Sequence, residues 1–150
     1  MKALALGFAL MAATLGFAPV ARADMNLGKY EVQWSRPWDF HTWVLQITQC
    51  VPPSGAGALL GCVKVSANPR PIARALQWRA VAPLENGRYT FTVDVPEGLL
   101  CGGYYGPSAP TRDTYSWYEK TLTGTMESAI AEGACGPART DTYPFALIRM

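Results

Sequence analysis

The chain has 150 residues, of which 49% are hydrophobic and 16% charged, and its 13 Lys and Arg residues against 11 Asp and Glu residues give a formal net charge of +2. This length fits one domain that can bury its own core. The small net charge and the lack of any run of Lys or Arg argue against a nucleic-acid partner, which would need a basic patch.

The first 23 residues have the organisation of a secretory signal peptide. Lys2 provides a basic start, an apolar run of 16 residues (3–18) follows, and Ala21-Arg-Ala23 is a small-x-small cleavage site. The run is shorter than the ~20 residues that a transmembrane helix needs. We therefore expect a signal peptide over 1–23 and a secreted or cell-envelope domain over 24–150, without a stable membrane span. Lys2 and Arg22 leave with the signal, which makes basic and acidic residues equal in number.

The first part of the predicted domain contains three strand candidates. Alternating apolar and polar residues predict strands over 30–34 and 43–50, and Cys62–Ser66 is the third. An aromatic-rich connection joins the first two. Asn68-Pro-Arg-Pro71 is expected to end the third strand, because proline cannot donate a backbone hydrogen bond.

The clearest element is a β-hairpin over Trp78–Val95. On its second arm, 88–95, apolar and polar residues alternate with the period of two that places one face in a core. Asn86-Gly87 is a dipeptide that favours the type I′ turn of a two-residue hairpin. We expect the second arm to stop at Pro96.

The last third of the chain predicts one long link and three further strands. Leu99–Thr111 is rich in Gly and Pro and is expected to be irregular. Strands are predicted over 113–118, 122–128 and 142–149, while 128–132 fits either the end of a strand or one helical turn. Pro144 places the last strand at a sheet edge or at the closure of a barrel, since it cannot donate to a ladder.

Together these segments predict a single all-β antiparallel domain of about eight strands. An up-and-down β-barrel is preferred, because consecutive strands look like hairpin neighbours and closure would remove exposed edges. A two-sheet β-sandwich is the alternative.

All four cysteines lie in the predicted exported part: Cys50, Cys62, Cys101 and Cys135. An even number in an oxidising compartment indicates two disulfides. We predict pairing in sequence order, Cys50 with Cys62 and Cys101 with Cys135, because Cys50 ends one predicted strand and Cys62 begins the next. A metal site is disfavoured, since the chain has no Cys-x-x-Cys pair and one histidine, His41. We expect neither a metal nor a cofactor.

Signatures of catalysis are missing from the sequence. It contains no Gly-x-Ser-x-Gly, no His-Glu-x-x-His and no phosphate-binding glycine loop, and no nucleophile is marked as a partner of His41. We therefore expect a protein that is not an enzyme. The alternative is a hydrolase of envelope polymers that uses a pair of its carboxylates.

The aromatic residues fall into two groups. Those in phase with strands are expected in the core: Trp34, Trp43, Trp78 and Trp117. Those in predicted loops are Trp38, Phe40, Tyr104 and Tyr105. Loop aromatics beside Gly and Pro can form a ligand rim or a protein contact. In an alternating meander both loops leave the same end, so we predict a binding mouth for a protein partner or a small apolar ligand. A further reading is an inhibitor or decoy whose Cys-bounded loops present contacts.

The C-terminal third also has an order of motifs found elsewhere. Asp113-Thr-Tyr-Ser-Trp-Tyr-Glu-Lys-Thr-Leu-Thr-Gly-Thr125 is followed by Gly133-Ala-Cys-Gly136 and Tyr143-Pro-Phe-Ala-Leu147. The order Trp, Leu-x-Gly-Thr, Cys-Gly, Pro-Phe-x-Leu resembles that of small secreted actinobacterial, mycobacterial-type β-proteins with cysteines, most of which are uncharacterised. The resemblance implies an exported protein and brings no active site with it.

Overall fold

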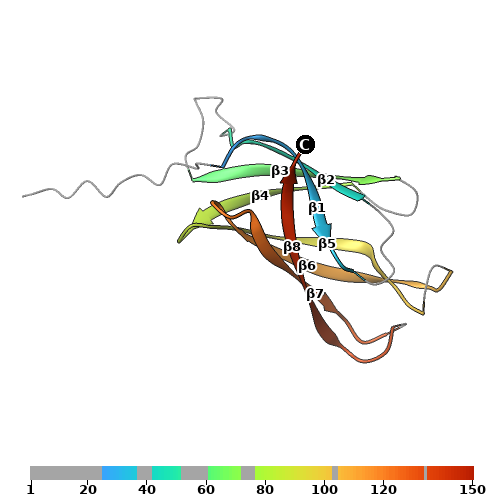
Figure 1. Ribbon diagram of the computed structural model, residues 1–150. Coiled ribbons are helices and arrows are strands. Elements are labelled where there is room, and N and C mark those ends of the chain that lie inside the picture. The colour runs from blue at the N-terminus through green and yellow to red at the C-terminus, as the bar shows by residue number, and fades with distance from the viewer. Residues whose placement is uncertain (1–24, 37–41, 52–60, 72–76, 103–104, 134) are drawn as a thin grey trace, which may run out of the picture.

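The computed structural model describes residues 25–36, 42–51, 61–71, 77–102, 105–133 and 135–150. They form a closed antiparallel barrel in which each strand pairs with the next and the last pairs with the first (Figure 1). The strands are β1 (Gly28–Trp34), β2 (Thr42–Gln49), β3 (Cys62–Arg70), β4 (Trp78–Glu85), β5 (Arg88–Leu100), β6 (Ser108–Tyr118), β7 (Thr123–Ile130) and β8 (Arg139–Arg149). The predicted all-β fold and the preferred barrel are confirmed. The described part of the chain contains no helix long and apolar enough to cross a membrane.

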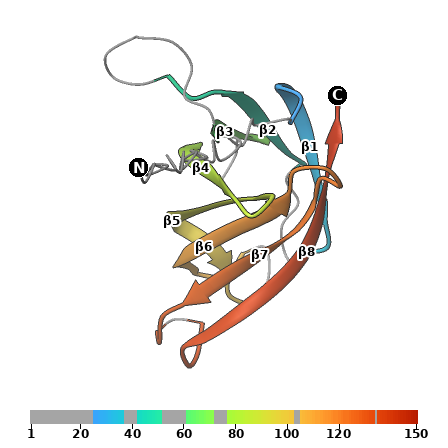
Figure 2. The same ribbon diagram turned by 90° about the vertical axis from the view of Figure 1, so that its left-hand side faces the viewer.

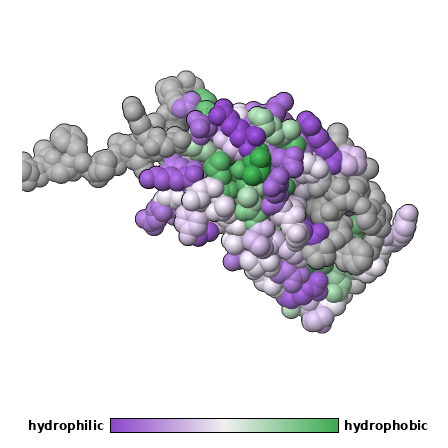
Figure 3. Space-filling model, viewed as in Figure 1, coloured by the Kyte–Doolittle hydropathy of each residue, from purple (hydrophilic) through white to green (hydrophobic). Residues whose placement is uncertain are grey.

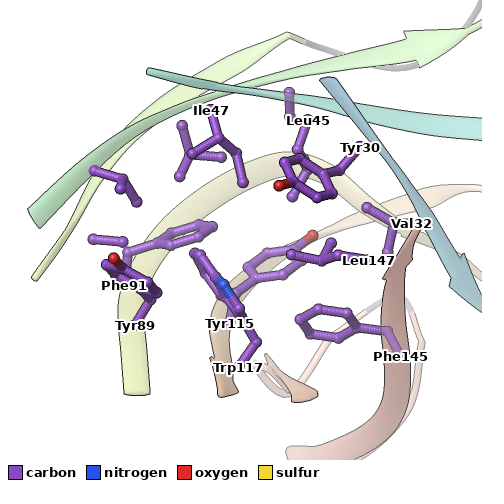
Figure 4. Packing of buried hydrophobic residues seen from close by; sticks show 14 of the residues in the cluster. Tyr30, Val32, Leu45, Ile47, Tyr89, Phe91, Tyr115, Trp117, Phe145 and Leu147 are labelled. Atoms are coloured by element: carbon purple, nitrogen blue, oxygen red, sulfur yellow. The ribbon is translucent and has the colours of Figure 1, made fainter. Parts of the chain in front are cut away.

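Alternate residues of the strands fill the barrel interior with apolar side chains. Figure 4 shows side chains from β1, β2, β5, β6 and β8 directed into this shared interior. Trp43 and Trp117 are buried there, and Trp34 and Trp78 are partly buried against the same cluster. The four tryptophans in strand phase are therefore core residues, as predicted.

β5 and β6 are longer than expected. The predicted stop at Pro96 is wrong, and the predicted irregular segment Leu99–Thr111 is wrong at both ends, because β5 continues to Leu100 and β6 begins at Ser108. The ladder between them shifts register between Val95 and Leu99, which is a bulge that accommodates Pro96.

Other strand ends also differ from the prediction. β3 continues past Ser66 to Arg70, and β8 begins at Arg139. Residues 128–130 belong to β7 and pair with β8, so the helical alternative is wrong for them. Gly124 in β7 allows close packing, since a Cβ atom there would lie 2.1 Å from the carbonyl oxygen of Ser116.

Prolines within the strands lie where pairing on one side has stopped. The amide of Leu147 donates to the carbonyl oxygen of Leu122, directly before β7, and alternation then directs the nitrogen of Pro144 toward β1. The β1–β8 ladder ends at Trp34–Phe145, so Pro144 lies one residue beyond it. Pro144 therefore marks the end of the closing ladder, which confirms its predicted place at barrel closure.

Both predicted disulfides are present. Cys50–Cys62 joins β2 to β3, with the two Cα atoms 5.9 Å apart, and Cys101–Cys135 joins the β5–β6 link to the β7–β8 link, with the Cα atoms 5.1 Å apart. Two disulfides fit an oxidising compartment.

Candidate functional site

The barrel has a seam between β4 and β5. These strands form two residue pairs, Leu84–Tyr89 and Glu85–Arg88, whereas the other seven ladders have five to ten pairs each. The intervening Asn86-Gly87 turn has φ values of 52° and 75°, which confirms the predicted type I′ turn. The predicted hairpin is wrong along most of its arms, because β4 and β5 separate beyond the turn (Figure 1). We call the facing edges, residues 78–83 and 90–95, the β4–β5 seam.

Pro83 explains why pairing stops so early. In a two-residue hairpin the residues flanking the turn, here Glu85 and Arg88, exchange hydrogen bonds, and the next pair that should do so is Pro83 with Thr90. Pro83 has no N–H group, so this rung loses a donor. Counted from the turn, the ladder therefore ends at Leu84, next to Pro83.

Backbone groups on both sides of the seam have no strand to pair with among the described residues. The amide of Leu84 donates to Gly61 next to β3, so alternation directs the N–H and C=O groups of Arg79 and Val81 into the seam. On β5 the same alternation directs those of Thr90 and Thr92 toward β4. All four residues are exposed.

Aromatic packing replaces hydrogen bonding on the inner side of the seam. The ring of Trp78 on β4 lies 5.2 Å from that of Phe91 on β5 and 5.3 Å from that of Tyr115 on β6, measured between centroids. Phe91 in turn stacks on Tyr115 at 4.9 Å. The buried Nε1 atom of Trp78 has no hydrogen-bond acceptor among the described residues. This ring cluster holds the two edges to one core although their backbones are unpaired.

A hollow of about 450 Å³ lies beside the seam on the outer surface of β2, β3 and β4. Lys64, Ser66, Arg79 and Val81 contribute to its lining. Val81 is 53% exposed on this surface. Figure 3 shows a group of apolar side chains over β3 and β4, bordered by hydrophilic ones.

The seam is paired at the Asn86-Gly87 turn and open toward the other end of the barrel. The β1–β2, β3–β4, β5–β6 and β7–β8 links all leave from that open end (Figures 1 and 2). Arg36 follows β1, and its Nη2 donates to the carbonyl oxygen of Gly98 on β5. The links predicted to carry the binding aromatics therefore start at the same end of the barrel.

A buried polar cluster closes the interior at this end. The Arg36 side chain is 6% exposed and its Nη1 lies 4.0 Å from Oδ2 of Asp113, whose side chain is 1% exposed. Oδ1 of Asp113 accepts a hydrogen bond of 2.6 Å from Ser128. The Arg36 guanidinium carbon lies 5.9 Å from the ring centroid of Trp34 and 5.7 Å from that of Tyr143. The cluster joins four strands, and the pairing of opposite charges compensates their burial.

Tyr143 connects this cluster to surface charges. Burial, followed by the nearby Asp141 carboxylate, raises the pKa of the Tyr143 phenol above its usual value of 10.0, while Arg36 and Arg139 oppose that rise. Asp141 accepts a hydrogen bond of 3.1 Å from Arg139. Asp113 is paired with Arg36 and Asp141 with Arg139, so we interpret the cluster as a structural cap on the barrel interior.

Of the four aromatic residues predicted to bind a ligand or partner, the structure describes one. Tyr105 is 97% exposed in the β5–β6 link, as expected for a contact residue. Trp38, Phe40 and Tyr104 lie outside the described residues, as does His41. The structure thus shows which end of the barrel is open. That the four loop aromatics form a binding mouth there stays a prediction.

Sequence reasoning did not identify the seam or the polar cap. Pro83 was the available signal for the seam, because a proline two residues before Glu85 removes the second rung of any hairpin turning at Asn86-Gly87. No comparable signal exists for Arg36 and Asp113, which are far apart in the sequence. Within the described ranges, no group of three or more His, Cys, Asp or Glu side chains is arranged to hold a metal ion.

No protein-family model, curated protein or solved structure matches this chain.

Proposed function

We propose that this protein is an exported, non-enzymatic binding domain that holds an extended segment of a partner polypeptide at the β4–β5 seam. The bare edge of β4 is the observation that carries the proposal. Among the described residues, the backbone groups of Arg79 and Val81 that face the seam have no strand partner, and such an edge is a template for an added strand. Export is supported by the predicted signal peptide and by the two disulfides.

The packing of the interior favours a polypeptide over a small apolar ligand. Trp78, Phe91 and Tyr115 pack ring against ring on the inner side of the seam, so a ligand entering from the seam would meet side chains. A strand at the edge of β4 needs no such space, since its affinity comes from main-chain hydrogen bonds. Tyr105 at the open end adds an exposed ring for further contact.

Selection from a random peptide display library on the oxidised protein, followed by amide-exchange mapping, tests this function. We expect selected peptides to slow exchange of the Arg79 and Val81 amides. Pro83→Thr supplies the missing donor and favours closure of the seam, so it should weaken peptide binding. The matched control is Thr125→Val on β7, a strand that does not border the seam, which should bind peptides normally.

Two results would contradict the proposed function. One is selected peptides that protect other parts of the barrel and leave the seam amides unchanged. The other is saturable binding of an apolar dye, such as a naphthalene sulfonate, inside a barrel that selects no peptides, which would support a small apolar ligand instead.

A further inference from the structure

We infer that the partner strand carries an acidic side chain opposite Arg79. This inference rests on the proposed function and specifies the chemistry of the segment that the β4 edge recognises. Three features of the described residues lead to it: the charge of β3 and β4, the register of the hairpin, and the hollow beside the seam.

The first feature is a one-sided charge distribution. β3 and the part of β4 that faces the seam carry Lys64, Arg70 and Arg79 and no acidic residue, the nearest being Glu85 beside the turn. Among the residues that the structure describes, Lys64 and Arg79 form no ion pair with an acid. The outer surface beside the β4 edge is therefore positive and uncompensated.

The second feature is the hairpin register. Continued from Leu84–Tyr89 toward the open end, it would place Asp94 of β5 opposite Arg79. In the structure Asp94 instead bonds Arg112 on β6, with Nη1 and Oδ1 3.1 Å apart. Asp94, the residue that a continued hairpin would pair with Arg79, is thus already ion-paired with Arg112 on β6. A partner strand that takes this place on β4 can supply the missing carboxylate.

The third feature is the hollow of about 450 Å³ lined in part by Lys64, Arg79 and Val81. Side chains that point outward from an added strand alternate with those that point inward. The partner side chain opposite Arg79 points outward, toward the hollow and the positive charges of Lys64 and Arg79. The partner side chain opposite Val81 also points outward and can cover that exposed valine.

Two synthetic peptides test the inference. The probe is acetyl-Val-Thr-Val-Thr-Val-Asp-Val-amide, which spaces Thr, Thr and Asp as β5 does at 90, 92 and 94 and replaces the buried rings by valine. The comparison peptide has Asn in place of Asp. Binding is measured by fluorescence anisotropy of labelled peptides and by exchange of the Arg79 and Val81 amides.

We expect the Asp peptide to bind about 1.4- to 5-fold more tightly than the Asn peptide, the range for one cross-strand pair of opposite charges. The ratio should fall toward one in the Arg79→Gln variant and at high salt. Arg149→Gln, an exposed Arg on β8, is the matched control and should keep the ratio.

The outcomes separate the two proposals. Equal binding of both peptides, with protection of the Val81 amide, overturns the acidic preference and leaves strand addition in place. A preference for the Asp peptide that persists in Arg79→Gln also overturns the assignment. If neither peptide changes the exchange of the Arg79 and Val81 amides, strand addition at β4 is contradicted and the inference falls with it.

Discussion

β5 has two very different neighbours. Toward β6 it forms ten residue pairs, and toward β4 it forms two. On the outer surface the β6 side adds hydrogen bonds of 2.9 Å between Thr92 and Thr114 and between Thr90 and Ser116. The β4 side offers Pro83, which lacks a donor. The extent of pairing on each side of β5 thus depends on the neighbouring strand. The strand propensity of β5 alone does not determine it.

The comparison implies that side chains hold the seam while backbone hydrogen bonds hold the β5–β6 ladder. Trp78→Ala removes the ring that joins β4 to Phe91 and Tyr115, and we expect it to lower the free energy of unfolding by about 3 kcal/mol. Urea denaturation measures this change. The control is Tyr118→Ala on the outer face of β6, where the half-exposed ring lies 4.4 Å from the Arg88 guanidinium carbon. This substitution should cost about 0.5–1 kcal/mol. Equal losses in the two variants would show that Trp78 has no special role at the seam.

Pro83→Thr should make the seam more like the β5–β6 ladder. One added hydrogen bond contributes about 0.5–1.5 kcal/mol, and losing proline from the unfolded chain costs about 0.4–1 kcal/mol, so the net change in stability should be about 1 kcal/mol or less. The sharper readout is amide exchange. We expect slow exchange at position 83 and slower exchange at Thr90. Unchanged exchange at Thr90 would show that something other than the missing donor separates the strands.

The smallest expected effect concerns the polar cap that ties β8 to the open end. The pKa of Tyr143 is raised in the folded protein, so folding favours the neutral phenol. This contribution is complete below pH 10 and is lost as the pH rises through the folded pKa. Tyr143→Phe should therefore lessen the alkaline fall in stability, measured as the unfolding midpoint between about pH 9 and 11. An unchanged alkaline slope in the variant would remove Tyr143 as its cause.

Local sequence signals predicted the parts of the fold that depend on local chemistry. Alternation placed the four core tryptophans, Asn86-Gly87 specified its turn, and cysteine order gave both disulfides. Prolines were the main source of error, because the third strand was expected to end at Asn68-Pro-Arg-Pro71 and the second hairpin arm at Pro96, whereas β3 continues through Pro69 and β5 through Pro96. In the barrel Pro144 and Pro83 stop pairing on one side only, and which side is bare depends on neighbours that the local sequence does not reveal.

The candidate site was less predictable than the fold. Tyr105 was identified as an exposed loop aromatic, and the alternation of strands placed its link at the same end as the β1–β2 link. The polar cap requires Arg36, Asp113 and Ser128 to converge from three parts of the chain, which only the closed barrel brings about. The seam is a property of register, and register is set by tertiary pairing.

Amide hydrogen exchange along β4 and β5 tests the central claim most directly. In β4 we expect slow exchange for Ala80 and Ala82, whose amides face β3, and fast exchange for Arg79 and Val81, whose amides face the seam.

In β5 we expect slow exchange for Phe91 and Val93, which face β6, and fast exchange for Thr90 and Thr92, which face β4. We expect alternating protection along both strands. Uniformly slow exchange through Val81 and Thr92 would mean that β4 and β5 are paired along their length, and it would contradict the seam and the binding site proposed there.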